Sequence, residues 1–144
     1  MDAVTDRLSV ILANTYVLYL KTQNYHWHVR GPHFYSLHQL FEMQYLELAA
    51  AVDGIAERML MMNQKAPATF QDYLRLMTLK EGDSQIDADK MIRDLAHDHQ
   101  TMVRDVEQAM ALAQAQKDEG SITLLSERIS AHEKAHWMLS ASCR

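Results

Sequence analysis

Apolar residues recur at intervals of three, four or seven along most of the chain, a spacing typical of amphipathic helices. The first run comprises Leu8, Ile11, Leu12, Leu18, Tyr19 and Thr22. It continues to about His26 and predicts a helix over residues 3–30, which Gly31 and Pro32 then end. The second run comprises Leu37, Phe41, Leu48, Val52, Ile55, Met59 and Met62. It predicts a helix over residues 36–63 with Ser36 as its N-cap.

The second half of the chain repeats this arrangement after an irregular stretch. Residues 64–85 contain Pro67, Gly82 and polar clusters, and we interpret them as a long crossover in which TFQDYLRLM forms a short helix capped by Thr69. A third helix is predicted over residues 86–117, and Gly120 separates it from a fourth over residues 121–141. Two hairpins joined by one long connection predict an all-α, ferritin-like four-helix bundle with a short helix in the crossover.

Composition agrees with one helical domain spanning residues 1–144. The chain has only four Gly and two Pro, which argues against a turn-rich β fold. The single cysteine, Cys143, cannot form an internal disulfide, so a reducing cytoplasm is the expected compartment. The sequence starts without a basic signal-peptide region and has no apolar run approaching the ~20 residues of a membrane span. A net charge of −5 argues against nucleic acid as the main partner.

The residues able to bind a metal concentrate on the second predicted helix. His38 and Glu42 are four residues apart and project from one face, and Asp53 and Glu57 repeat that spacing further along. Eleven residues separate Glu42 from Asp53, which returns to nearly the same face but ~16 Å along the axis. One ion therefore cannot contact both pairs of one helix.

Two copies of this helix, packed antiparallel across a two-fold axis, would bring the pairs together. His38 and Glu42 of one chain would then face Asp53 and Glu57 of the other, with the axis between residues 47 and 48 and the two sites roughly 22 Å apart. The residues between the pairs on this face are apolar or small, namely Leu46, Ala49 and Ala50. Such residues permit the close helix approach that an interface needs.

His26 joins this set through the geometry of the first hairpin. It lies six residues before Pro32, and His38 lies six after it, so the two histidines should be level across the turn. The alternative is that His26 continues the apolar stripe as a hydrogen-bonded core histidine. His28 is about 200° around the helix from His26 and His33 lies in the turn, so both are expected to be surface or structural residues.

A mixture of imidazoles and carboxylates suits iron(II), manganese or zinc better than copper(I), and one shared site could hold one or two irons. The competing location is inside the bundle, where ferritin-type di-iron proteins use two Glu-x-x-His motifs. Here Glu133 to His136 is the single match, so that site is disfavoured. We interpret His132 and His136 as structural residues near Trp137. His97 and His99 should point to different faces, and the ten methionines are expected in the core or an interface.

Two blocks resemble the Dps family, the DNA-binding proteins from starved cells, also called mini-ferritins. They are HWHVRGPHFYSLHQLFEMQYLELAAAVDGIAERM at residues 26–59 and HEKAHWML at residues 132–139. The resemblance implies that the ferroxidase ligands are His26, His38, Glu42, Asp53 and Glu57. It places Trp27 beside the centre, either as a radical quencher or as an aromatic packing residue. The residue at the position of Glu42 is Asp in some members.

The resemblance further implies a hollow dodecamer built from two-fold dimers. Such a cage oxidises Fe(II), commonly with hydrogen peroxide and otherwise with oxygen, and stores ferric mineral against oxidative stress; zinc or manganese can take the place of iron. Asp118, Glu119 and Glu127 are candidates for an iron-entry pore, with a solvated charged face as the alternative.

The first ten residues depart from the family pattern, because they contain two Asp, one Arg and no Lys. DNA-coating members often use a lysine-rich N-terminal extension, so weak or absent DNA binding is expected. The alternative functions are a nucleoid-compacting DNA-binding protein and, disfavoured by the intact ligand set, a surface protein that kept only the cage.

Overall fold

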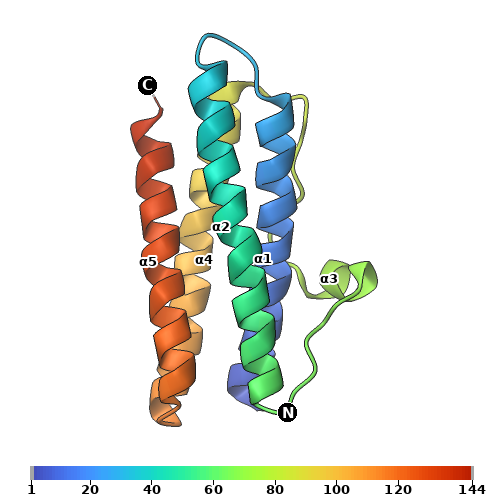
Figure 1. Ribbon diagram of the computed structural model, residues 1–144, viewed down its shortest axis with the longest axis vertical. Coiled ribbons are helices and arrows are strands. Elements are labelled where there is room, and N and C mark those ends of the chain that lie inside the picture. Colours follow the sequence, from blue (N-terminus) through green and yellow to red (C-terminus); the bar gives the residue numbers. More distant parts are fainter. Residues whose placement is uncertain (1, 144) are drawn as a thin grey trace.

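The computed structural model describes residues 2–143, and the regular structure within them consists of five helices. These are α1 (Ala3–His28), α2 (Phe34–Met61), α3 (Phe70–Leu76), α4 (Ala88–Ala115) and α5 (Glu119–Ala141). The hairpin of α1 and α2 lies beside the hairpin of α4 and α5, and α3 stands to one side against α1 (Figure 1). The predicted all-α four-helix bundle with a short crossover helix is confirmed. None of the helices in residues 2–143 is long and apolar enough to span a membrane.

The core forms where the apolar stripes of the four long helices meet. Its largest fully buried side chains are Tyr25, Phe41, Leu8, Ile11, Leu12, Leu18, Leu48, Ile55, Met59, Met91, Ile92 and Leu95. Burying each aliphatic or aromatic side chain stabilises the fold by about 1.5–3 kcal/mol, so packing of these stripes is the main force that aligns the helices. The predicted periodicities of three and four are therefore the cause of the bundle.

Acidic and hydroxyl side chains cap four of the five helices. Asp2, Thr69, Asp87 and Asp118 each accept a hydrogen bond from a backbone N–H in the first turn of the helix that follows. Such a cap satisfies one of the N–H groups that have no partner within the helix. The prediction that Thr69 caps the crossover helix is confirmed.

The predicted cap of α2 is wrong. The helix begins at Phe34 with His33 at the N-cap position, and the Ser36 hydroxyl instead donates to the His33 carbonyl oxygen at 3.2 Å. Gly31 adopts a φ of 118°, which lets the Phe34 N–H reach the Gly31 carbonyl oxygen at 3.1 Å. This tight turn starts the helix three residues earlier than an N-cap at Ser36 would.

Gly120 does not separate the last two helices, as the sequence suggested, but lies in the first turn of α5. The break falls at Lys117, whose φ is 56°. A side chain at position 120 would collide with the guanidinium of Arg58, which reaches across from α2. Arg58 donates to Asp118 at 2.7 Å. A larger side chain at position 120 would therefore displace the Arg58 guanidinium from its present position.

The same contact gives Asp118 a structural role. Partial burial acts to raise the pKa of its carboxyl, but hydrogen bonds from Ser121 and the charge and hydrogen bond of Arg58 outweigh it and lower the pKa. The carboxylate caps α5 and joins α5 to α2.

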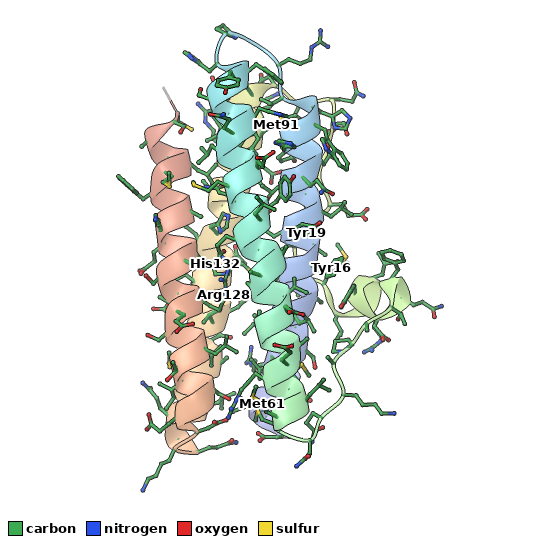
Figure 2. All side chains as sticks on the ribbon, in the orientation of Figure 1. Tyr16, Tyr19, Met61, Met91, Arg128 and His132 are labelled. Atoms are coloured by element: carbon green, nitrogen blue, oxygen red, sulfur yellow. The ribbon has the colours of Figure 1, made fainter. Side chains whose placement is uncertain are left out.

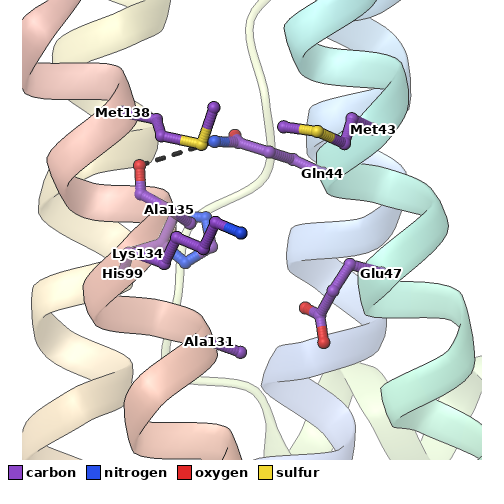
Figure 3. A pocket seen from close by; sticks show the side chains of 8 residues that line it. All are labelled: Met43, Gln44, Glu47, His99, Ala131, Lys134, Ala135 and Met138. Atoms are coloured by element: carbon purple, nitrogen blue, oxygen red, sulfur yellow. Dashed lines mark hydrogen bonds between the residues drawn. The ribbon is translucent and has the colours of Figure 1, made fainter.

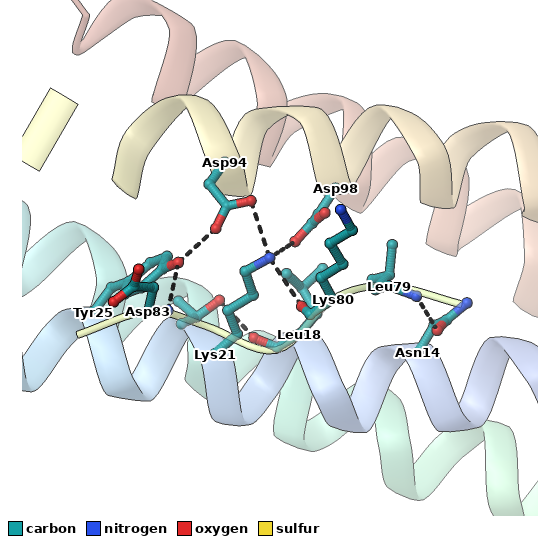
Figure 4. A network of polar contacts seen from close by, with 10 residues as sticks. Asn14, Leu18, Lys21, Tyr25, Leu79, Lys80, Asp83, Asp94 and Asp98 are labelled. Atoms are coloured by element: carbon teal, nitrogen blue, oxygen red, sulfur yellow. Dashed lines mark hydrogen bonds and ion pairs between the residues drawn. The ribbon is translucent and has the colours of Figure 1, made fainter. Parts of the chain in front are cut away.

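A buried ion-pair network fixes the crossover to the bundle (Figure 4). The ammonium of Lys21, on α1, donates to Asp98 at 2.8 Å, to Asp94 at 3.0 Å and to the Lys80 carbonyl oxygen of the crossover at 3.0 Å. Tyr25 donates its hydroxyl to Asp94. Burial raises the pKa of Asp98, although the hydrogen bond and charge of Lys21 oppose that rise. The network holds α1, the crossover and α4 in one register.

Replacing Lys21 with methionine should destabilise the protein by about 3–5 kcal/mol, because it leaves Asp98 buried without its cation. The free energy of unfolding from urea titration measures this loss. Lys80→Met removes an exposed lysine next to the same network and should change the free energy of unfolding little. Equal effects of the two substitutions would contradict the structural role of Lys21.

Candidate metal centre

The structure brings His26 and His38 into direct contact at one end of the α1–α2 hairpin. Their rings stack with centroids 3.8 Å apart and planes 12° from parallel. His26 is buried and His38 is half-buried. Counting residues from Pro32 therefore predicted the right alignment across the turn.

Each of these two histidines is oriented by the main chain of the other. His26 Nδ1 lies 2.7 Å from the His38 carbonyl oxygen, and His38 Nδ1 lies 2.7 Å from the His26 carbonyl oxygen. A carbonyl oxygen only accepts hydrogen bonds, so both Nδ1 atoms carry the proton. In the neutral rings both Nε2 atoms then keep a free lone pair, which is the form that binds a metal.

One carboxylate and two aromatic rings surround this pair. Glu42 Oε1 lies 3.7 Å from His26 Nε2, and half of its side chain is exposed. Tyr45 meets His26 edge-on with centroids 5.2 Å apart, and Phe34 stacks on the other side of His38 at 5.0 Å. The rings hold the imidazoles in place, while Glu42 supplies a nearby negative charge.

Asp53 and Glu57 do not reach this cluster within one chain. Both lie exposed on the second half of α2. Within residues 2–143 there is no group of three or more His, Cys, Asp or Glu side chains placed for one metal ion. A single chain therefore presents two separate parts of the predicted ligand set.

The face of α2 that carries these parts is uncovered in the single chain. Leu46 is 56 % exposed, Ala50 is exposed and Ala49 is half-buried, so an apolar strip runs between Glu42 and Asp53. An exposed apolar strip of this kind on a helix surface is typical of a contact with another protein chain.

The remaining residues near the hairpin turn lie outside this cluster. Trp27 is 58 % exposed on α1. His28 is exposed, and its Nδ1 lies 2.8 Å from the Asn24 carbonyl oxygen. His33 is an exposed residue at the N-cap of α2. The prediction that His28 and His33 are surface or structural residues is confirmed.

The disfavoured site inside the bundle is replaced by a buried histidine pair that sequence reasoning missed. His99 on α4 and His132 on α5 are buried, with their Nδ1 atoms 2.9 Å apart, while Glu133 is exposed. His132 also contacts Arg128 (Figure 2). The available signal was that His99 continues the stripe of Leu95 and Met102. His97 is exposed, so the expected separation of His97 from His99 is confirmed.

Burial and hydrogen bonding keep both histidines of this pair neutral. Arg128 forms a two-pronged ion pair with Glu47 and donates to His132 Nε2 at 3.2 Å. His132 Nδ1 must then donate to His99 Nδ1, so both rings are neutral. Burial, followed by the charge of Arg128, lowers the pKa of His99 to about 3, and burial lowers that of His132 in the same direction.

A pocket of about 130 Å³ adjoins this pair between α2 and α5. Gln44 spans its upper side and donates weakly to the Ala135 carbonyl oxygen at 3.4 Å (Figure 3). Glu47 is the only carboxylate in the lining, and it is paired with Arg128. A di-iron centre of the ferritin type needs several free carboxylates, so this part of the bundle does not fit one.

The neutral histidine pair should make stability depend on pH. Unfolded histidines protonate near pH 6.5, whereas the folded pKa values are lower, so the stabilisation is complete above that pH and is lost as the pH falls. Below pH ~6.5, each histidine should lower the free energy of unfolding by about 1.4 kcal/mol for each unit that the pH falls. Urea unfolding of wild type and of the His99→Leu/His132→Leu double variant measures the difference in slope. His28→Leu, at an exposed position, should keep the wild-type slope, and a double variant with that same slope would contradict the assignment.

The sequence and the fold match known proteins over nearly the whole chain. The ferritin-like domain family matches residues 5–144. DNA protection during starvation protein 2 of Bacillus anthracis is 36% identical over 138 residues, covering 96% of this chain and 94% of that protein. Dps from Thermosynechococcus elongatus has a TM-score of 0.93 and 33% identity, covering 96% and 88% of the two chains. A Dps protein from Vibrio cholerae O1, described as a member of a broad superfamily of ferritin-like diiron-carboxylate proteins, has a TM-score of 0.92 and 33% identity, covering 96% and 87%.

Proposed function

The chain belongs to the Dps family of ferritin-like proteins, and from this premise we propose that it is a ferroxidase and iron store. It oxidises Fe(II), with hydrogen peroxide as the preferred oxidant, and keeps the ferric product inside a hollow cage of twelve chains. The main support is the His26–His38 pair, in which reciprocal hydrogen bonds leave both Nε2 atoms free for a metal.

We place each iron site across a two-fold interface. His26, His38 and Glu42 come from one chain, and Asp53 and Glu57 come from its neighbour. Three observations support this arrangement: the two half-sites lie on the same helix but apart, no complete metal group occurs in residues 2–143, and the apolar strip between the half-sites is exposed. An isologous contact between two α2 helices covers the strip and completes two sites at once.

The roles of the residues follow from their chemistry. The two imidazoles bind Fe(II) through neutral nitrogen, and the three carboxylates balance the added charge that develops when iron is oxidised. Hydrogen-bonded Nδ1 atoms keep the rings from rotating, so the geometry is retained as iron enters and leaves. The ferric product leaves the site for the cavity. Zinc or manganese would occupy the same ligands.

A complementation experiment tests the shared site. His38→Ala and Asp53→Ala should each abolish rapid Fe(II) oxidation in separately assembled protein. Random co-assembly makes about half of the dimers mixed, and one of the two sites in each mixed dimer is intact, so about a quarter of all sites should recover. The initial rate of Fe(II) oxidation with peroxide measures the recovery.

The control is a mixture of the two variants assembled separately, which should remain inactive. His28→Ala removes an exposed histidine near the same hairpin turn and should keep the wild-type rate. Background activity after co-assembly, with mixed cages confirmed by mass spectrometry, would refute a site shared between chains.

DNA binding should be weak or absent at neutral pH. The net charge is −5, and each contact with a phosphate needs a cation that releases counterions. The Bacillus anthracis relative is named for DNA protection, and we expect protection here to come from removing iron and peroxide. A gel-shift assay with duplex DNA at low and at physiological salt measures binding. A tight, salt-sensitive complex would favour the nucleoid-compacting alternative.

A further inference from the structure

Four tyrosines form a continuous series of ring contacts that ends at the candidate metal centre. Tyr45 meets His26 with ring centroids 5.2 Å apart, and Tyr19 meets Tyr45 at 5.9 Å. Tyr16 meets Tyr19 at 5.8 Å, and Tyr73 of α3 stacks on Tyr16 at 4.9 Å with planes 25° apart. The series therefore connects the histidine pair to the crossover helix on the side of the bundle.

Helix periodicity explains why the rings line up. Tyr19 lies seven residues, or two turns, before His26 on α1, and Tyr16 lies three residues before Tyr19. Tyr45 lies seven residues after His38 on α2 and meets Tyr19 across the groove between the two helices. Figure 2 marks Tyr16 and Tyr19 on the side of α1 that faces α3.

All four rings are half-buried, which limits the contact of a tyrosyl radical on them with the solvent. The chain has six tyrosines, and the other two have different surroundings. Tyr25 is buried and donates to Asp94. Tyr35 is 69 % exposed on α2, only three residues from His38. A tyrosine that is near the centre in sequence is thus outside the series, which provides a matched control.

We propose that Tyr45, Tyr19, Tyr16 and Tyr73 form a relay that carries one-electron oxidising equivalents away from the metal centre to α3. This inference rests on the proposed oxidation of Fe(II) by peroxide. Its purpose is to protect the ligands His26 and His38 when a site contains one Fe(II), which can supply only one of the two electrons that peroxide requires.

The chemistry of the relay balances at every step. One Fe(II) reduces hydrogen peroxide to hydroxide and a hydroxyl radical, and becomes Fe(III). The hydroxyl radical takes an electron and a proton from Tyr45, which gives water and a neutral tyrosyl radical. Tyr45 recovers an electron and a proton from Tyr19, Tyr19 recovers them from Tyr16, and Tyr16 from Tyr73. Each transfer leaves one neutral radical and one intact phenol.

The far end of the series is the place where the radical comes to rest. Tyr73 donates its hydroxyl to the Pro67 carbonyl oxygen at 2.7 Å, which holds the ring against Tyr16. Because Tyr73 belongs to the short helix α3, a radical there is away from the His26–His38 pair and within reach of a reductant from the solvent.

The relay can be separated from random attack by radicals that diffuse through solvent. The assembled protein is loaded with less than one Fe(II) per site, and excess hydrogen peroxide is added in the presence of a nitrone spin trap. Peptide mass spectrometry then locates the adducts, and the optical rate of Fe(II) oxidation is recorded on the same sample. We expect adducts at Tyr16 and Tyr73 in the wild type.

Conservative variants determine the order of the transfers. Tyr19→Phe keeps the packing but cannot form a neutral phenoxyl radical. Adducts at Tyr16 and Tyr73 should therefore fall to the level without iron, and adducts should appear at Tyr45. Tyr45→Phe should remove adducts from the whole series. Tyr35→Phe should leave the pattern unchanged, and neither Tyr35→Phe nor Tyr19→Phe should alter the rate of Fe(II) oxidation.

The two ways of failing are distinguishable. Normal Fe(II) oxidation with adducts ranked by exposure, Tyr35 first, or with Tyr73 still labelled in Tyr19→Phe, would overturn the relay and leave the proposed function intact. Absence of Fe(II) oxidation in the wild type would overturn the proposed function, and the relay would fall with it because it would have no oxidising equivalent to carry.

Discussion

The register of the α1–α2 hairpin is the constraint on which the candidate site depends. Gly31 closes the turn, and the buried stripes of both helices then fix how far each residue lies from it. His26 and His38 consequently arrive at the same level and orient each other through paired hydrogen bonds to main-chain oxygens. A shift of one residue would break both bonds and rotate one imidazole by about 100° around its helix axis.

The bundle interior is arranged so that metal chemistry is kept out of it. In ferritin-type di-iron proteins the four helices direct carboxylates inward. Here the inward positions carry a neutral histidine pair, and the one nearby carboxylate, Glu47, is paired with Arg128. In the proposed arrangement the iron ligands lie on an outer face of α2, so activity would depend on assembly, because each half-site alone holds only part of the ligand set.

Two ion-pair contacts fix the long helices of the bundle relative to one another. Lys21 ties the crossover to α1 and α4, and Arg58 ties the start of α5 to the end of α2. Both cations are held by carboxylates in partly or fully buried surroundings, where an ion pair specifies geometry more than it adds stability. Lys21 thereby fixes the position of α1 against α4, and Arg58 fixes the position of α2 against α5.

The sequence by itself determined the helices, their order and the level at which His26 meets His38, because these follow from local periodicity and from counting residues across one short turn. It also placed Asp53 and Glu57 too far along α2 to join them. The tertiary structure alone decided which polar residues of different helices contact each other: Lys21 with Asp98, His99 with His132, and Tyr16 with Tyr73. These partners are tens of residues apart and belong to different helices, so no local pattern records their contact. Position 120 is a further case, since the close neighbour of Gly120 is the Arg58 guanidinium, which comes from another helix.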